Sequence, residues 1–458
     1  MGTASSKERK NIEVSYWLDL TFFKMGFWIT WALIPVVVEV LPAFFSSIWL
    51  IVQHWHPVKL KVPEKLPVIS LIIPVYNSEA TLYDCIRSVN DSSYPSNLVQ
   101  IILADNQSTD NSFAVYERAQ NEFPNLNLRL IRTEQGKAKA LNSAIYSSIG
   151  TYIINIDSDG VLEKNALMNM VLRFENDSKL AALTGTILPQ KELIRSSKKR
   201  SLRLLQRNEY FEYAQAFLSG RIIESRSNRL FTMSGAFSAF RKNDLLQTFL
   251  YNTGTIGEDT DMTFQMRDRL KSKVAICSDA IFYIEPIDSL DDLYIQRQRW
   301  QTGELEVVDK NESDLKLKSF FRSFLVRRMM LDHTFLFPKL IWSAASIVLL
   351  FLGYSWVILL MSYLLIYFLY IGVSLLNYIC VLLLLRGFTE ERAFFRASWW
   401  VVFTLPFYNF ICSWFRLIGT LNSMTRRSSW NTIRFKQEIV KLYRQFLEDI
   451  KTIKNKWR

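Results

Sequence analysis

The chain has 458 residues, a formal net charge of +12, and 49% hydrophobic and 14% aromatic residues. This length excludes a single ordinary domain, so two or more structural parts are expected. So much hydrophobic sequence beside so much charge fits a membrane protein with a soluble part, and the basic excess indicates nucleic acid, anionic lipid or anionic small substrates as partners.

The N-terminal part, residues 1–56, is predicted to hold an amphipathic stretch and a transmembrane helix. The candidate span runs from Trp31 to Val52 and carries Glu39, a carboxyl that is costly in a bilayer unless it faces protein or water. The polar opening residues, MGTASSKERKN, do not begin a cleavable secretion signal. A linker rich in Pro and Lys, HPVKLKVPEKLP, follows this part.

Residues 57–315 are predicted to form a soluble domain in which strands alternate with helices. The segments interpreted as strands are VISLIIPVY, VQIILAD, LNLRLIRT and TYIINIDSD, and helical patterns separate them. This alternation indicates an α/β fold with a parallel, doubly wound sheet that binds its ligands at the carboxyl ends of the strands. Polar residues do gather at these ends, namely Tyr76, Asn77, Asp105, Asp157 and Asp159.

Two of these acids form the pair in IDSDG. Asp157 and Asp159 follow an apolar strand, and hard oxygen ligands with open positions suit Mg²⁺ or Mn²⁺ shared with substrate phosphates. A strand that ends in an acidic turn gives the same pattern, and the pair taken alone favours that plainer interpretation. Lys137 in GKAKALN stands at a helix start, where backbone N–H groups favour an anion.

Three later segments carry further polar chemistry. TMSGAFSAFRK is a turn of small residues, either for tight packing or as a floor for a substrate. TIGEDTDMTFQMRDRL places Glu258 and Asp259 at a helix start, where acids also complement the helix dipole. QRQRW, residues 296–300, is either a solvated helix face with a half-buried Trp or a place that holds an anion and a flat ring together.

Residues 316–425 are predicted to be membrane-associated. No charged residue occurs between Leu340 and Leu385, a run of about twice the bilayer core at roughly 1.5 Å per residue, so two helices with a turn between Gly353 and Ser362 are expected. Ala397 to Phe415 is a further candidate span. Residues 426–458 are expected to form a basic cytosolic tail.

In chain order, the segments IPVYNSE, ADNQSTD, GKAKALN, DSD, SGAF, GED and QRQRW resemble the membrane-integrated family-2 glycosyltransferases. These are inverting enzymes of the GT-A fold and include cellulose, hyaluronan, chitin and poly-N-acetylglucosamine synthases. The resemblance covers about residues 66–310, and QRQRW after the GED helix is its most specific part. It implies a Rossmann-like GT-A domain on the cytosolic side, inserted between transmembrane helices of a multi-pass plasma-membrane protein.

The resemblance also implies which residues bind the donor. Asp105 would hydrogen-bond the uracil, the backbone near Val75 and Tyr76 would line the base, and Lys137 would lie close to the nucleotide. The chain departs from the family at Asn106–Gln107, where Asp-Gly usually follows the first Asp, which puts any role for a second acid there in doubt.

The remaining implied roles concern the reaction. Asp157 and Asp159 match the metal-binding D-x-D, with Asp159 the better ligand for Mg²⁺ or Mn²⁺. Asp259 would be the general base, and Gly235 would border the acceptor. The residues that match the family's Q-x-x-R-W are Gln296, Arg299 and Trp300, of which Arg299 would hold diphosphate and Trp300 the acceptor sugar.

The implied activity is transfer of a sugar from a UDP-sugar to a growing β-linked polysaccharide, with elongation and secretion of an exopolysaccharide. One alternative is transfer of a single sugar to a polyprenyl phosphate or other lipid acceptor. Another is an inactive scaffold for glycan transport, against which Asp157, Asp159, Asp259 and Arg299 all argue by their presence. The expected partners are the UDP-sugar, a polysaccharide or lipid-linked acceptor, membrane lipids and, where one exists, an accessory protein. Nucleic acid is not expected, because the basic residues concentrate beside the membrane segments.

A cytosolic domain and a cytosolic tail require an even number of crossings between them, yet three candidate spans follow the domain. Either Ala397 to Phe415 is re-entrant or interfacial, or another segment such as FFRSFLVRRMMLDHTFLF contributes. The latter segment has the pattern of a basic amphipathic helix that lies along the interface.

Overall fold

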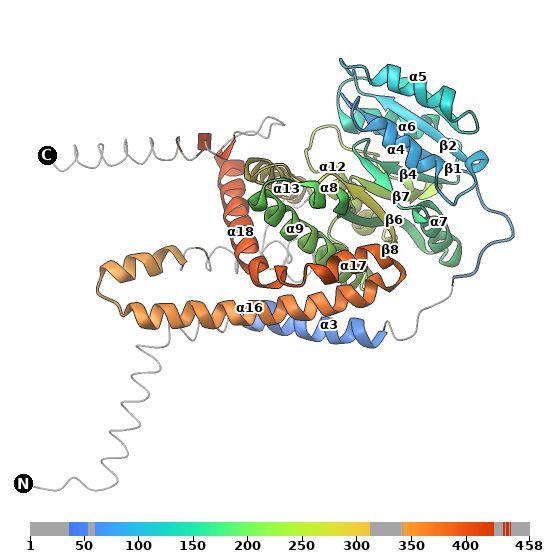
Figure 1. Cartoon of the computed structure of the whole chain (residues 1–458). Coiled ribbons are helices and arrows are strands. Elements are labelled where there is room, and N and C mark those ends of the chain that lie inside the picture. Colours follow the sequence, from blue (N-terminus) through green and yellow to red (C-terminus); the bar gives the residue numbers. More distant parts are fainter. Residues whose placement is uncertain are drawn as a thin grey trace, which may run out of the picture.

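The computed structural model describes residues 36–53, 60–311, 340, 343–425, 434–435, 437–438 and 440. The predictions for the N-terminal amphipathic stretch, for the basic interfacial segment before Leu340 and for most of the tail lie outside these residues. Figure 1 shows an α/β domain with several long helices beside it.

An eight-stranded sheet forms the centre of the α/β domain, in the order β3-β2-β1-β4-β7-β6-β8-β5. The strands are β1 Ile69–Val75, β2 Val99–Asp105, β3 Asn127–Arg132, β4 Tyr152–Ile156, β5 Gly160–Leu162, β6 Leu180–Pro189, β7 Phe237–Arg241 and β8 Lys273–Ile284. The four strands predicted from the sequence, β1 to β4, are present and parallel.

The prediction of a wholly parallel sheet is wrong. Strand β7 runs antiparallel to both β4 and β6, and β5 runs antiparallel to β8. The chain leaves β6 at Pro189 and enters β7 at Phe237, which pairs with Ile156 at the end of β4. Because this connection begins and ends at the same edge of the sheet, it does not cross the sheet, and β7 must run back.

The helices of the α/β domain are α4 Leu82–Asn90, α5 Ser112–Glu122, α6 Lys137–Ser147, α7 Ala166–Asn176, α8 Lys191–Ser196, α9 Arg200–Ala214, α10 Arg221–Arg226, α11 Lys242–Leu245, α12 Glu258–Phe264 and α13 Leu290–Asn311. The other long helices are α3 Leu41–Gln53, α16 Trp356–Leu384, α17 Thr389–Ala397 and α18 Val401–Thr425. Helices α4, α5 and α6 fall where the sequence pattern predicts them.

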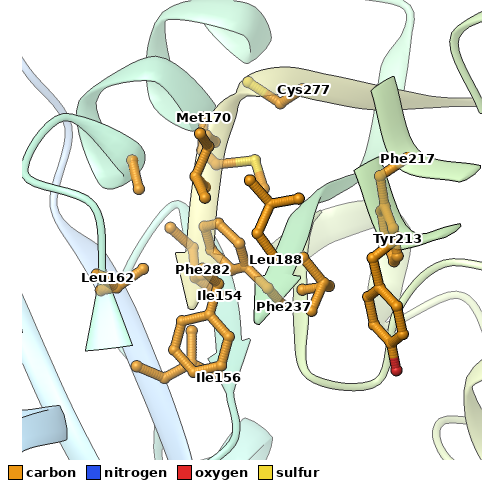
Figure 2. Close-up of a cluster of buried hydrophobic side chains, with 14 of the residues drawn as sticks. Ile154, Ile156, Leu162, Met170, Leu188, Tyr213, Phe217, Phe237, Cys277 and Phe282 are labelled. Atoms are coloured by element: carbon orange, nitrogen blue, oxygen red, sulfur yellow. The ribbon is translucent and has the colours of Figure 1, made fainter. Parts of the chain in front are cut away.

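Both faces of the sheet are covered by helices. In β1, Ile69 and Leu71 point into one buried cluster, whereas Ile72 points into the other. This alternation follows from the two-residue period of a strand. Figure 2 shows part of the first cluster, where Phe237 of β7 and Phe282 of β8 pack below α7. The buried sheet gives the loops at its edge a fixed support.

Two described helices are long and apolar enough to cross a membrane, by length and composition alone: Trp356–Gly387 and Val401–Ser423. Residues 343–351 are also helical, and the chain then turns at Gly353, whose φ of +82° suits glycine. This turn lies where the sequence predicts it. Helix α3 is shorter and lies along α16, where the Cys380 thiol donates to the Ser47 carbonyl oxygen (3.5 Å; Figure 1).

A buried charge cluster attaches the α/β domain to α17. Lys191 of α8 pairs with Glu391 of α17 at 2.5 Å, and both side chains are buried. The hydroxyl of Tyr283, in β8, donates to the same carboxylate at 2.8 Å. Removal of one partner from a buried ion pair typically costs about 3–5 kcal/mol, because the other charge stays buried without compensation.

Candidate active site

A cavity of about 470 Å³ lies at the edge of the sheet where β4 ends and β7 begins. Its walls come from α6, the segment after β4, the segment before β7, α12 and α13. The residues that the sequence singled out and that line it are Lys137, Asp157, Asp159, Gly235, Asp259, Gln296, Arg299 and Trp300. Residues separated by more than 160 positions along the chain therefore meet in one place.

A second cavity, of about 320 Å³, lies at the ends of β1, β2 and β3 and contains Val75 and Asp105. One carboxylate oxygen of Asp105 accepts the N–H of Ser108 at 3.1 Å. Phe113 and Arg132 also line this cavity. Tyr76, which follows β1, lines neither cavity and is 51% exposed.

Asn106, where the sequence departs from the resembling family, has a structural role. Its N–H donates to the Val75 carbonyl oxygen at 2.8 Å, and its side-chain oxygen accepts the N–H of Gly136 at 2.5 Å. Gly136 directly precedes α6, so Asn106 fixes the start of the helix that carries Lys137.

The first charged group in the larger cavity is the pair of Lys137 and Asp157, whose Nζ and Oδ1 atoms are 2.5 Å apart. Burial alone would lower the pKa of Lys137, but Asp157 and Glu258 hold it above its ordinary value. Burial, and then the charge of Asp157, raise the pKa of Asp159 to about 6. Lys137 forms an ion pair with Asp157 and not with Asp159 among the contacts of the described residues.

Asp157 and Asp159 are the candidate ligands of a divalent cation. Among the described residues, no group of three or more His, Cys, Asp or Glu side chains could hold a metal ion. The two carboxylates do face one cavity, and burial together with the charge of Asp157 raises the pKa of Asp159. Mg²⁺ is usually held by one or two carboxylates together with substrate phosphates. The residues therefore fit a cation whose coordination a substrate completes.

Asp259 lies in the first turn of α12 and faces the same cavity. Its two carboxylate oxygens accept backbone N–H groups, one from Thr260 at 2.7 Å and one from Gly235 at 3.3 Å. Burial raises the pKa of Asp259, and burial together with Asp259 raises the pKa of Glu258 to about 7. A carboxylate that is oriented by two N–H groups and has a raised pKa is suited to accept a proton.

Two glycines, which the sequence reasoning missed, bring α12 against α13. A Cβ atom on Gly257 would lie 2.6 Å from the Gly303 carbonyl oxygen, and a Cβ on Gly303 would lie 2.9 Å from the Gly257 Cα. The Glu306 carboxylate accepts the N–H of Ile256 at 3.1 Å beside this contact. Gly303 lies inside α13, where glycine costs about 1 kcal/mol relative to alanine. That unfavourable placement is the signal that could have revealed the contact.

The QRQRW segment lies within α13, and its two arginines differ. Arg297 is buried and forms an ion pair with Glu212 of α9, while its guanidinium lies 4.4 Å from the centre of the Trp300 ring. Arg299 is exposed and Trp300 is 45% exposed, and both face the cavity. All three side chains line the cavity, but Arg297 is buried beside the Trp300 ring and supports it, whereas Arg299 and Trp300 are exposed there.

A buried carboxyl on α9 was also missed. Glu209 is fully buried, and one of its oxygens accepts the N–H of Ile287 at 3.0 Å. Its other oxygen has no hydrogen-bond partner among the described residues. Burial raises the pKa of Glu209 to about 8. Nothing in the sequence around Glu209 distinguishes it from a solvated acid.

Comparison with known proteins gives matches in sequence and in structure. Residues 70–247 match the family described as Glycosyl transferase family 2. A poly-beta-1,6-N-acetyl-D-glucosamine synthase of Staphylococcus epidermidis is 25% identical over 382 residues, which are 81% of this chain and 82% of that protein. The protein of the same name from Staphylococcus aureus (strain COL) is 27% identical over 298 residues, 63% of this chain and 65% of that protein.

Among solved structures, a mannosyltransferase from Pyrobaculum calidifontis in complex with GDP-Man and Mn²⁺ superposes with a TM-score of 0.54. It is 17% identical, and the superposition covers 86% of this chain and 99% of that chain. At this identity the likeness concerns the fold, which is the α/β fold of a glycosyltransferase with a mixed sheet.

Proposed function

Since this chain carries a family-2 glycosyltransferase domain at residues 70–247, we propose that it is a membrane-associated enzyme that elongates a β-linked polysaccharide from a UDP-sugar. The observation that carries this proposal is the single cavity in which Asp159, Asp259, Arg299 and Trp300 converge. The name shared by the two staphylococcal relatives supports a polysaccharide product and makes UDP-N-acetylglucosamine the first donor to test.

The donor would occupy both cavities. The base fits the smaller one, where Asp105 can accept hydrogen bonds from uracil and the end of β1 lines the ring. The diphosphate would then reach the larger cavity, between Lys137 and Arg299. When bound by Asp157 and Asp159, a Mg²⁺ or Mn²⁺ ion would offset the negative charge that develops on the UDP leaving group.

The reaction would be a direct displacement. Asp259 accepts the proton of an acceptor hydroxyl while that oxygen forms a bond to the anomeric carbon of the donor. The bond between this carbon and the UDP oxygen breaks at the same time, and the electron pair leaves with UDP. Attack from the face opposite UDP inverts the anomeric carbon, so an α-linked donor gives a β-linkage. One carboxylate base is sufficient, because no covalent sugar–enzyme intermediate forms.

Trp300 would position the acceptor. Its exposed ring offers a flat apolar surface to the terminal sugar, and such a surface does not depend on which way the polymer is turned. The domain would lie on the cytosolic side, where nucleotide sugars occur, and the apolar helix α16 supports a position beside the membrane.

The test is UDP release by purified membranes with a panel of UDP-sugars, together with sizing of the product by gel filtration. The expected result is a long polymer from one donor, and UDP release that is lower by about 10²–10⁴-fold for the Asp259→Asn variant in the same membranes. A wild-type product that is only a singly glycosylated lipid would replace polymer synthesis by transfer to a lipid acceptor. No UDP release from any donor would contradict both.

A further inference from the structure

The larger cavity contains an acid, Glu285, for which the proposed reaction has no use. Glu285 directly follows β8, and its exposed side chain lines the cavity together with Asp159. Within the part of the chain that the structure describes, the Glu285 carboxylate has no ion pair and no hydrogen bond. Its two oxygens are therefore open to a ligand of the cavity.

The sheet sets Glu285 against Asp159. Strands β5 and β8 run antiparallel, and Gly160 pairs with Ile284. One step further in this register, Asp159 and Glu285 come opposite each other at the open end of the strand pair. Directly opposed residues have Cβ atoms about 4.5–5.5 Å apart, and two like charges there are destabilising. Burial and the charge of Asp157 raise the pKa of Asp159, and the charge of Glu285 adds to this rise. The fold thus retains an unfavourable contact at the edge of the cavity.

The backbone on both sides of Glu285 is held in place. The Ile284 carbonyl oxygen accepts the N–H of the residue before α8 at 2.8 Å. Ile287 donates its N–H to Glu209 at 3.0 Å and accepts a hydrogen bond from the Gln206 side-chain amide at 2.9 Å, and both partners belong to α9. Glu285 is therefore an exposed carboxylate on a fixed backbone, which is the arrangement of a preorganised binding group.

The chemistry of the cavity indicates which ligand Glu285 meets. A resident cation does not explain it, because no three acids of the described residues converge on a metal ion. In the proposed reaction the diphosphate lies between Lys137 and Arg299, and the anomeric carbon lies near Asp259. The sugar ring of the donor must then occupy the remaining part of the same cavity, which Glu285 lines. Glu285 is one methylene longer than Asp159, so its carboxylate extends further into this space.

The hydroxyl groups of a sugar complement such a carboxylate. Each hydroxyl is a hydrogen-bond donor, whereas an ionised carboxylate is an acceptor only, with two oxygens. Hydrogen bonds to a charged acceptor are roughly twice as strong as those between neutral groups. A site that is built to bind a particular hydroxyl also rejects a sugar that lacks it, because the acceptor then stays without a partner.

We propose that Glu285 binds hydroxyl groups of the donor sugar and so helps to select the sugar that is transferred. Its carboxylate accepts hydrogen bonds from one or two ring hydroxyls, while Asp157 and Asp159 remain with the cation. The unfavourable contact with Asp159 is retained because it keeps an acceptor at this position. The inference rests on the proposed function, since it requires a UDP-sugar in the cavity, and it adds a group that distinguishes one sugar from another.

The test compares the binding of UDP with that of UDP-N-acetylglucosamine by calorimetry, with Mn²⁺ present. The parent protein is the full chain with Asp259→Asn, so that the donor is not consumed during the titration. Glu285→Gln and Glu285→Ala are made in this parent. The matched control is Asp288→Asn, an exposed acid three residues further along that lines neither cavity. Glu285→Gln should melt at or above the temperature of the parent, because it removes the repulsion of Asp159.

We expect both Glu285 variants to bind UDP-N-acetylglucosamine about 10–100-fold more weakly than the parent does, with UDP affinity unchanged. The amount of bound Mn²⁺ in the presence of UDP, measured by electron paramagnetic resonance, should also stay the same. Asp288→Asn should alter none of these values. Among the 3-deoxy, 4-deoxy and 6-deoxy forms of the donor, at least one should bind the parent as weakly as the full donor binds Glu285→Ala. That variant should not distinguish this deoxy donor from the full one.

Three results would overturn the proposal. One is an affinity for UDP-N-acetylglucosamine that is equal in the parent and in both Glu285 variants. Another is an equal loss of affinity for UDP and for the UDP-sugar, or a loss of bound Mn²⁺, either of which would assign Glu285 to the diphosphate and its cation. A parent that binds neither ligand, in contrast to both of these results, would contradict the proposed function itself and this inference with it.

Discussion

Substitution of Gly303 by alanine tests whether the contact between α12 and α13 sets the geometry of the active site. The new Cβ would lie 2.9 Å from the Gly257 Cα and 3.0 Å from its nitrogen, both of which are backbone atoms that cannot rotate away. Non-bonded carbon atoms rest at about 3.5–4.0 Å, so the two helices must separate by roughly 0.6–1.1 Å. Overpacking of this kind costs about 1–3 kcal/mol of stability.

The expected loss of activity is larger than the loss of stability suggests. Asp259 follows Gly257 by two residues and Trp300 precedes Gly303 by three, so the separation moves the proposed base away from the proposed acceptor platform. A misplacement of about 1 Å can cost about 100-fold in rate. We therefore expect kcat for UDP release to fall about 100-fold, while the melting temperature falls by only a few degrees.

The matched control is Gly254→Ala in the loop before α12. There the nearest atom to the new Cβ is the Asn252 side-chain oxygen at 3.5 Å, an ordinary contact, so kcat should not change. A Gly303→Ala protein that is folded and keeps wild-type kcat would refute the reasoning, because the contact would then have no bearing on the position of Asp259.

Four further predictions concern single side chains. Asp259→Asn should lower kcat by about 10²–10⁴-fold and leave UDP affinity by calorimetry nearly unchanged, since the base acts on the acceptor; joint loss of both would contradict its role. Asp159→Asn should abolish activity, as should excess EDTA on the wild type, whereas full turnover in EDTA would exclude a metal requirement. Trp300→Ala should abolish elongation while slow donor hydrolysis survives, measured as UDP release without polymer; polymer of wild-type length would contradict the platform role. Burial raises the pKa of the Glu209 carboxyl to about 8. Between the ordinary pKa of a glutamate and this value, Glu209 therefore keeps its proton in the folded chain but is ionised in the unfolded chain. Stability should therefore fall from about pH 5 to pH 8, by up to about 1.4 kcal/mol per unit, and Glu209→Gln should flatten this fall in melting temperature; parallel curves for both proteins would refute it.

The first half of the sheet could be predicted from the sequence because β1, β2 and β4 are apolar runs that end near polar residues, and β3 alternates apolar and polar residues. VQIILAD and TYIINIDSD gave β2 and β4 and located Asp105 and Asp157 at one edge. The reversed strand β7 could not be predicted in the same way. The direction of β7 depends on the position at which the helices between β6 and β7 bring the chain back to the sheet. Tertiary packing determines that position, and no local sequence pattern indicates it.

The candidate site also has a part that could be predicted from the sequence and a part that could not. Lys137 and Asp259 could be located because each lies at the start of a helix that the sequence pattern indicates, whereas Arg299 lies within α13 and was located only by the family resemblance. The different roles of Arg297 and Arg299 could not be separated, since both are arginines of one helix and only packing against Glu212 distinguishes them. The burial of Glu209 could not be predicted either, because it too results from tertiary packing.

In the membrane-associated enzyme that we propose, the charge cluster of Lys191, Glu391 and Tyr283 would fix the height of the reaction above the bilayer. Tyr283 is followed directly by Ile284 and Glu285, which line the larger cavity, while Glu391 belongs to the helix between α16 and α18. Because the buried pair cannot open without leaving a charge uncompensated, the α/β domain would stay on these helices between the successive transfers that we propose. A polymer made here would leave the enzyme at one constant level, and a bilayer of different thickness would have to adapt to the protein at that level.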